Sequence, residues 1–218
     1  MAIEAVGSSD RSGWWFGLAG LVLVFVGFFG IDGGGSMGPD SPVAELAAEI
    51  TDSPTRVTVG STVGIVGALA LVVFAAALRM RLGREGSLGE LLALVAFAFG
   101  IIMAIGGVVH GSFRMATSES IHPNLLEDAI LPLSILKEHV SDLFMLGAVG
   151  LVATMSVASL SVGLLPRAYG WIGLALVVAT VALIPTGLGV GGLTLFFWLI
   201  AACGVLIRGR SEIHARPR

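Results

Sequence analysis

The sequence predicts an all-α membrane protein, a polytopic bundle of six transmembrane helices with a small outer cap of one or two short helices. Three observations predict this fold class. Six stretches, each about as long as a bilayer crossing, contain no Asp, Glu, Lys or Arg. Apolar residues make up 56% of the 218 residues and charged residues only 12%, about half the usual fraction of a soluble domain. Glycine, which allows helices to approach closely in membranes, occurs 31 times.

The positions of the spans follow from helix geometry. A helix rises about 1.5 Å per residue, so a hydrocarbon core of about 30 Å requires roughly 20 apolar residues. We therefore expect a single membrane domain over residues 1–218. Its spans are expected at residues 14–31, 57–78, 91–109, 143–165, 168–190 and 191–207. The first stretch is interpreted as a retained anchor rather than a signal peptide, because Glu4 and Asp10 precede it and no small-x-small cleavage site is evident.

The distribution of basic residues predicts the orientation, because cytoplasmic loops are enriched in Lys and Arg. Nine of the twelve basic residues lie in one set of segments, which consists of Arg11, Arg79, Arg81, Arg84, Arg167, Arg208, Arg210, Arg216 and Arg218. The opposite set holds Arg56, Arg114 and Lys137, together with ten of the fifteen acidic residues. Both termini are therefore expected in the cytoplasm, with the protein in the inner (plasma) membrane. Trp14, Trp15, Tyr169 and Trp171 would form an interfacial aromatic belt at the inner side, whereas Trp198 would pack inside the bundle.

The two outer segments, 32–56 and 110–142, carry most of the polar residues. Ser41-Pro42 is a good helix start, and the apolar residues that follow recur with helical periodicity, which predicts a short acidic amphipathic helix over 41–52. Residues 124–136 are mostly helical in pattern, with Pro132 as a kink or a break. Residues 137–142 run into the fourth span without a turn signal, so this span is expected to project beyond the membrane by one or two turns.

Candidate ligand-binding or pH-sensing residues lie at this outer rim, since no span contains an ionisable residue at mid-depth. They are His110, Arg114, Glu138, His139 and Asp142. A pH-sensitive pair of His110 with Glu138 or Asp142 is one interpretation, and a solvated ion-pair network between spans three and four is the other. Three imidazoles near one rim make His110, His122 and His139 weak metal candidates. No HExxH, HxH or HxxxH spacing occurs, so no metal site, cofactor or catalytic residue is assigned.

Small and hydroxyl residues within the spans predict packing. The Gly60-x-x-x-Gly64 and Gly107-x-x-x-Gly111 pairs favour close intramolecular helix contacts over dimerisation. The hydroxyls of span four, Thr154, Ser156, Ser159 and Ser161, do not form one stripe, and they can bond to their own helix backbone or to a neighbour. Cys203, the single cysteine, excludes a disulfide framework and is expected to be a buried small apolar residue.

Two stretches resemble the bacterial membrane family called domain of unknown function 4386. They are Asp142-Leu-Phe-Met-Leu-Gly147 and Gly163-Leu-Leu-Pro-Arg167-Ala-Tyr-Gly170-Trp-Ile-Gly173, followed by Phe197-Trp198 and Arg208 near the end. The Pro42-Val-Ala-Glu45 and Arg56 segment before span two is also similar. The resemblance implies a six-span architecture and brings no catalytic residues. Ser141 precedes Asp142 where the family has a His-Asp step.

The function predicted from these observations is that of a non-enzymatic scaffold, regulatory or partner-binding subunit. The bilayer is one partner, and a protein partner or a second copy of the chain is possible in addition. Nucleic acid is not expected, because the net charge of −3 offers phosphate little attraction. The alternative is a binder or transporter of an apolar or amphiphilic small molecule. A membrane enzyme or metal site at the outer rim is the third hypothesis.

Overall fold

The computed structural model describes residues 5–31, 54–119, 126–183 and 190–213, and its regular structure over these ranges is helical without any strand. The first helix, α1 (Ala5–Phe25), continues into the π-helical segment η1 (Val26–Ile31). It is followed by α3 (Pro54–Leu82), α4 (Gly86–Glu119), α5 (Leu126–Ser161), α6 (Arg167–Leu183) and α7 (Val190–Ile213). The amphipathic helix predicted over 41–52 and the turn after Pro185 lie outside the described residues.

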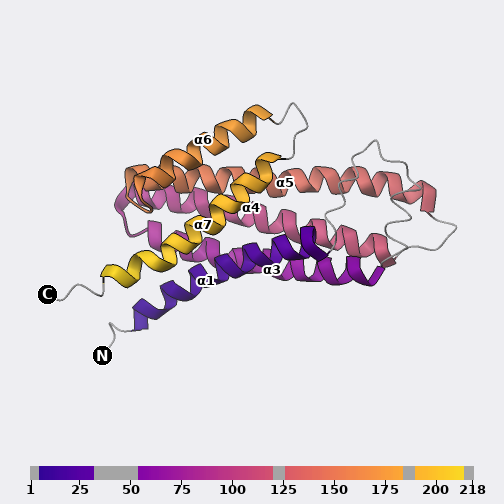
Figure 1. The fold of residues 1–218 in the computed structure, drawn as a ribbon, viewed down its shortest axis with the longest axis horizontal. Helices are drawn as coiled ribbons and strands as arrows, with labels where there is room; N and C mark the ends of the chain where they lie inside the picture. The colour runs from indigo at the N-terminus through magenta and orange to yellow at the C-terminus, as the bar shows by residue number, and fades with distance from the viewer. Residues whose placement is uncertain (1–4, 32–53, 120–125, 184–189, 214–218) are drawn as a thin grey trace.

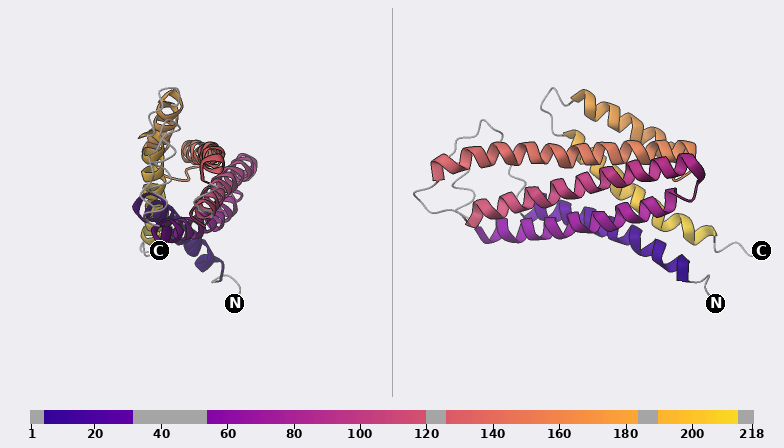
Figure 2. Two further views of the ribbon diagram at one scale, coloured as in Figure 1. Left: turned by 90° about the vertical axis from the view of Figure 1, so that its right-hand side faces the viewer. Right: turned by 180° about the vertical axis from the view of Figure 1, so that it is seen from behind.

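The helices form a closed ring in chain order. Each helix packs against the next one, and α7 returns to α1, with a further contact between α7 and α5 (Figures 1 and 2). The start of α1 and the end of α7 lie at the same end of the bundle (Figure 1), which we call the inner end. The outer end is the opposite one, where α4 ends and α5 begins. One continuous hydrophobic core runs through the ring.

Three helices are long and apolar enough to cross a membrane: Thr55–Leu82, Gly86–Ala116 and Asp142–Ser161. The apolar parts of the other helices are shorter, at Gly13–Phe28, Arg167–Leu183 and Leu193–Arg208. The all-α bundle predicted from the sequence is confirmed over the described residues.

Close contacts at glycine residues join α1 and η1 to α3. A Cβ atom on Gly67 would lie 2.6 Å from the backbone nitrogen of Val24 and 2.7 Å from the carbonyl oxygen of Gly20, so α1 and α3 meet backbone to backbone. Gly60 and Gly64 both border Gly27 in the same interface. Such close approach increases dispersion contacts, which drive helix association when hydrophobic burial contributes little.

The second glycine pair contributes to the interface between α3 and α4. A Cβ atom on Gly107 would lie 2.8 Å from Cβ of Ala68, and one on Gly111 would lie 2.6 Å from Cγ1 of Ile65. The prediction of intramolecular packing for both glycine pairs is therefore confirmed.

The course of α5 differs from the prediction at both ends. The helix begins at Leu126 and continues through Pro132 without a break, so it extends sixteen residues before the apolar stretch that starts at Asp142. At its inner end α5 stops at Ser161, not at 165, because Gly163 takes a left-handed backbone conformation with φ 72°. The N–H of Leu164 then donates to the carbonyl of Ala158.

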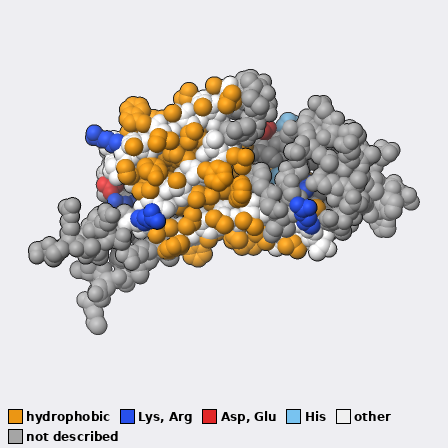
Figure 3. Space-filling view, in the orientation of Figure 1, with side chains coloured by type: hydrophobic (Ala, Val, Ile, Leu, Met, Phe, Trp, Pro, Cys, Tyr) orange, Lys and Arg blue, Asp and Glu red, His pale blue; other side chains and the backbone are white. Residues whose placement is uncertain are grey.

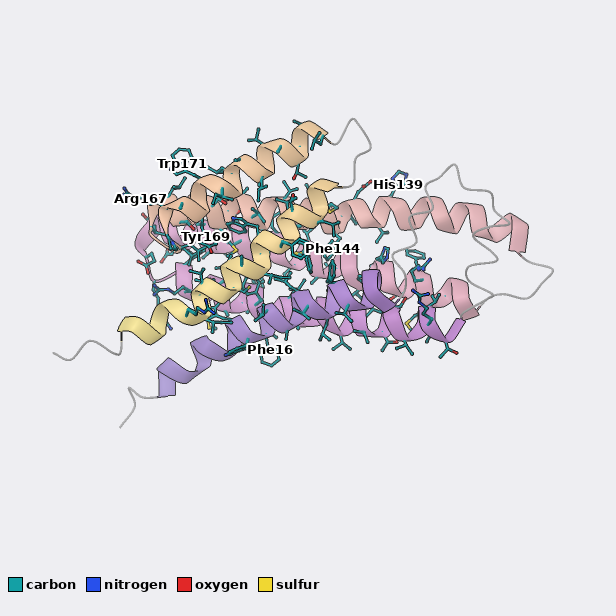
Figure 4. All side chains as sticks on the ribbon, viewed as in Figure 1. Phe16, His139, Phe144, Arg167, Tyr169 and Trp171 are labelled. Carbon is teal, nitrogen blue, oxygen red and sulfur yellow. The ribbon has the colours of Figure 1, made fainter. Side chains whose placement is uncertain are left out.

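The tryptophans divide between the core and the surface. Trp14 is 3% exposed and packs edge-on against Phe74, with ring centroids 5.9 Å apart. Its predicted place in an interfacial belt is therefore wrong, whereas Trp15 and Trp171 are exposed as that belt requires. Trp171 projects outward from α6 in Figure 4. Trp198 and Cys203 are buried, as predicted.

Candidate functional site

Two of the predicted rim residues, His110 and Arg114, lie one turn apart on α4 near the outer end. The ring of Phe28 in η1 meets the His110 imidazole edge-on, with centroids 4.9 Å apart. Phe28 also covers Gly64 of α3, so His110 lies where η1, α3 and α4 converge. Arg114 is only 3% exposed. Arg114 therefore belongs to the interior of the outer end rather than to a solvated rim, and His110 is partly buried.

His139 and Asp142 form a separate pair on α5. His139 Nδ1 lies 3.7 Å from an Asp142 carboxylate oxygen, and both side chains are about three-quarters exposed, at 73% and 76%. Figure 4 shows His139 on the outward side of α5 and Phe144 on the inward side. An exposed pair of this kind contributes little to stability, because solvent screens the charges.

The register of α4 against α5 explains this separation. Gly106 packs against the backbone of Phe144, and Gly147 packs against that of Met103, so the two helices are antiparallel with His110 level with Val140. Val140 is buried at that level, which turns its neighbour His139 away from the interface. The structure therefore brings His139 to Asp142 and His110 to Phe28.

The other rim candidates are Glu138 and His122. The side chain of Glu138 and the whole of His122 are outside the described residues, so the predicted pair of His110 with Glu138 stays a prediction. Among the side chains that the structure describes, no three His, Cys, Asp or Glu residues gather as a metal site would require.

A second polar location, which sequence reasoning did not single out, lies where α5, α6 and α7 meet. Three buried side-chain polar atoms have no hydrogen-bond partner in the described part of the chain: Ser61 Oγ, Ser156 Oγ and Trp198 Nε1. Two of these residues, Ser156 and Trp198, pack against the same glycine. A Cβ atom on Gly173 would overlap the Ser156 hydroxyl and would lie 2.8 Å and 3.0 Å from Cζ2 and Cε2 of the Trp198 indole.

The other hydroxyls of α5 behave differently from Ser156. Thr154, Ser159 and Ser161 each donate to the carbonyl oxygen four residues earlier, at 2.7, 2.6 and 2.7 Å. The prediction of bonding to their own helix is thus confirmed for these three. Ser156 is 0% exposed and makes no such bond. The sequence does not distinguish Ser156 from the other three residues, because each of the four hydroxyls can reach a backbone carbonyl of its own helix. Ser156 differs only because its hydroxyl lies against the glycine on α6.

No family model, curated protein or solved structure matches the chain. The resemblance to domain of unknown function 4386 therefore stays a prediction.

Proposed function

We propose that the chain is a non-enzymatic, six-span integral membrane protein that acts as a scaffold or partner-binding subunit through its outer end. The length of α5 carries this proposal. Its sixteen residues before Asp142 form a helical extension of about 24 Å at 1.5 Å per residue. A rigid helical extension offers a partner a surface that needs little ordering on binding. The outer segments are strongly acidic, which favours a protein partner with a basic surface.

The outward faces of the helices support six spans. All six helices, including the three with shorter apolar stretches, present large apolar side chains to the outside, such as Phe16 on α1, Val178 on α6 and Phe197 on α7, which are 50%, 67% and 55% exposed. Figure 3 shows such side chains across the middle of the bundle, with Arg side chains toward its ends. Exposed apolar area on this scale is costly in water and natural in lipid.

Topology can be tested by cysteine labelling. Replacing buried Cys203 by alanine gives a cysteine-free background, into which single cysteines are introduced at His139 or at Arg84. We expect a membrane-impermeant maleimide to label H139C in intact spheroplasts, and R84C only after the membrane is permeabilised. Equal labelling of the two positions before permeabilisation would contradict six spans with cytoplasmic termini.

Partner binding at the outer end can be tested by photo-crosslinking in living cells. A photoreactive amino acid at exposed His139 should give a discrete adduct with a second protein after irradiation. The matched control is the same amino acid at Val178, which is equally exposed but lies on the apolar outer face of α6. A differently tagged second copy in the adduct would identify a homo-oligomer. Absence of any protein adduct at His139, or the same adduct at both positions, would rule out the outer end as the partner-binding surface.

A further inference from the structure

We propose that Arg79 and Phe97, on the surface of α3 and α4 near the inner end of the bundle, bind the phosphate group of an anionic phospholipid. This inference rests on the proposed membrane embedding and is independent of the partner at the outer end. Arg79 is exposed and lies three residues before the end of α3 at Leu82. It is the first charged residue after Arg56, so it marks the level at which α3 leaves the apolar part of the bilayer.

The register of α3 against α4 brings Arg79 to Phe97. A Cβ atom on Gly100 would lie 2.5 Å from Cβ of Ala75, so these two positions face each other in antiparallel helices. Phe97 is three residues from Gly100 toward the inner end, and Arg79 is four residues from Ala75 in the same direction. Cζ of the Arg79 guanidinium accordingly lies over the Phe97 ring, 5.2 Å from its centroid. This cation–π contact holds the guanidinium at a defined place on the surface.

The contact with Phe97 leaves the hydrogen-bond donors of Arg79 unused, because a phenyl ring carries no oxygen acceptor. In the part of the chain that the structure describes, the Arg79 side chain has no ion pair and no hydrogen bond. Arg81 differs, since its Nη1 lies 3.5 Å from Oε1 of Glu85. Glu90, the other carboxylate described at the inner end, is seven residues from Phe97 along α4, about 10 Å at 1.5 Å per residue.

The surface beside Arg79 determines which anion fits. A guanidinium matches two oxygens of a phosphate group, to which it can donate two N–H bonds. Ile101 and Ile105 follow Phe97 on the same face of α4 at one-turn intervals toward the middle of the bundle, and Ile105 is 52% exposed. Val73 on α3 is 42% exposed.

An anionic phospholipid satisfies both parts of this surface. Its phosphate meets the cation, and its acyl chains lie along the exposed apolar side chains, which a free phosphate ion leaves uncovered. The proposed orientation also places Arg79 at the cytoplasmic leaflet, where anionic lipids give the membrane surface its negative potential.

The inference can be tested by titrating lipids against the purified full-length protein in a neutral detergent and counting the bound lipids by native mass spectrometry. The probes are dioleoylphosphatidylglycerol, dioleoylphosphatidylcholine and inorganic phosphate. We expect the first phosphatidylglycerol molecule to bind more tightly than phosphatidylcholine and to resist displacement by equimolar phosphate. R79Q should weaken its binding about fivefold, the loss expected for one basic residue facing an anionic lipid. F97L keeps the charge but removes the ring, and it should weaken the binding about threefold.

The matched control is R81Q, which removes the same charge two residues further along α3, from a side chain that already pairs with Glu85. It should bind phosphatidylglycerol within about twofold of the wild-type protein, because an exposed pair of this kind adds little. Thermal unfolding of all variants separates loss of the site from loss of the fold.

Four results would each overturn the proposal. They are equal binding of phosphatidylcholine, displacement of the lipid by equimolar phosphate, equal losses in R79Q and R81Q, and wild-type binding by F97L. The cysteine-labelling test of topology does not depend on any of these measurements, so failure of the lipid site and failure of the six-span proposal are distinguishable.

Discussion

Replacing Gly67 by valine should lower the free energy of unfolding of the bundle by about 3 kcal/mol, because overpacking of a close interface costs this much when its neighbours cannot move. A Cβ atom at this position meets the backbone nitrogen of Val24 and the carbonyl oxygen of Gly20 at 2.6 and 2.7 Å. Backbone atoms cannot rotate away as a side chain can. The variant must therefore separate α1 from α3 and lose the dispersion contacts along that interface.

The control for this variant is Gly204→Ala on α7. Nothing lies within 4 Å of the Cβ that this substitution adds, and alanine favours the helix more than glycine does. Reversible unfolding in detergent should therefore show G204A at least as stable as the wild-type protein and G67V clearly less stable. Similar stability of G67V and the wild-type protein would contradict the close packing of α1 on α3.

Trp14→Ala should destabilise the protein by about 3–5 kcal/mol, the usual range for removing a large aromatic side chain from a packed core. Trp14 is 3% exposed and makes an edge-to-face contact with Phe74, which is itself 1% exposed. Alanine leaves a cavity between α1 and α3 that neighbouring backbone cannot fill.

The adjacent Trp15→Ala variant is a control of the same chemistry. Trp15 is 56% exposed, so its removal should change the free energy of unfolding by no more than about 0.5 kcal/mol. The two variants can be compared by thermal unfolding in the same detergent. If W15A is as destabilised as W14A, then Trp14 is not the residue that joins the two helices.

Helices and their approximate positions could be predicted because apolar composition and length decide them. Their ends depend on single residues. Span four was expected to continue to 165, yet Gly163 ends α5 at Ser161 by adopting a positive φ. Pro132 was expected to kink or break a helix, and α5 continues through it without a break. Proline is a weak signal here because its effect depends on the surrounding contacts, which one-dimensional patterns do not contain.

The side-chain partners of the candidate site residues were less predictable for the same reason. Sequence spacing placed His110 and Arg114 on one face of a helix, but it could not show that Phe28 of η1 would contact His110. Trp14 and Trp15 are chemically identical neighbours, and only the packing of α1 decides which one is buried. Ser156 differs from Ser159 solely through Gly173 on another helix.

The contact between α7 and α1 has a consequence for biosynthesis. Phe25 of α1 stacks on Phe196 of α7 at 5.7 Å and meets Phe197 at 5.8 Å, so the ring closes through residues almost a whole chain apart. A ribosome makes α1 first and α7 last, which leaves Phe25 without these two neighbours until translation is nearly complete. Formation of the first five helices and closure of the ring are therefore separate events in time. A nascent chain that stops before α7 leaves this aromatic side of α1 uncovered.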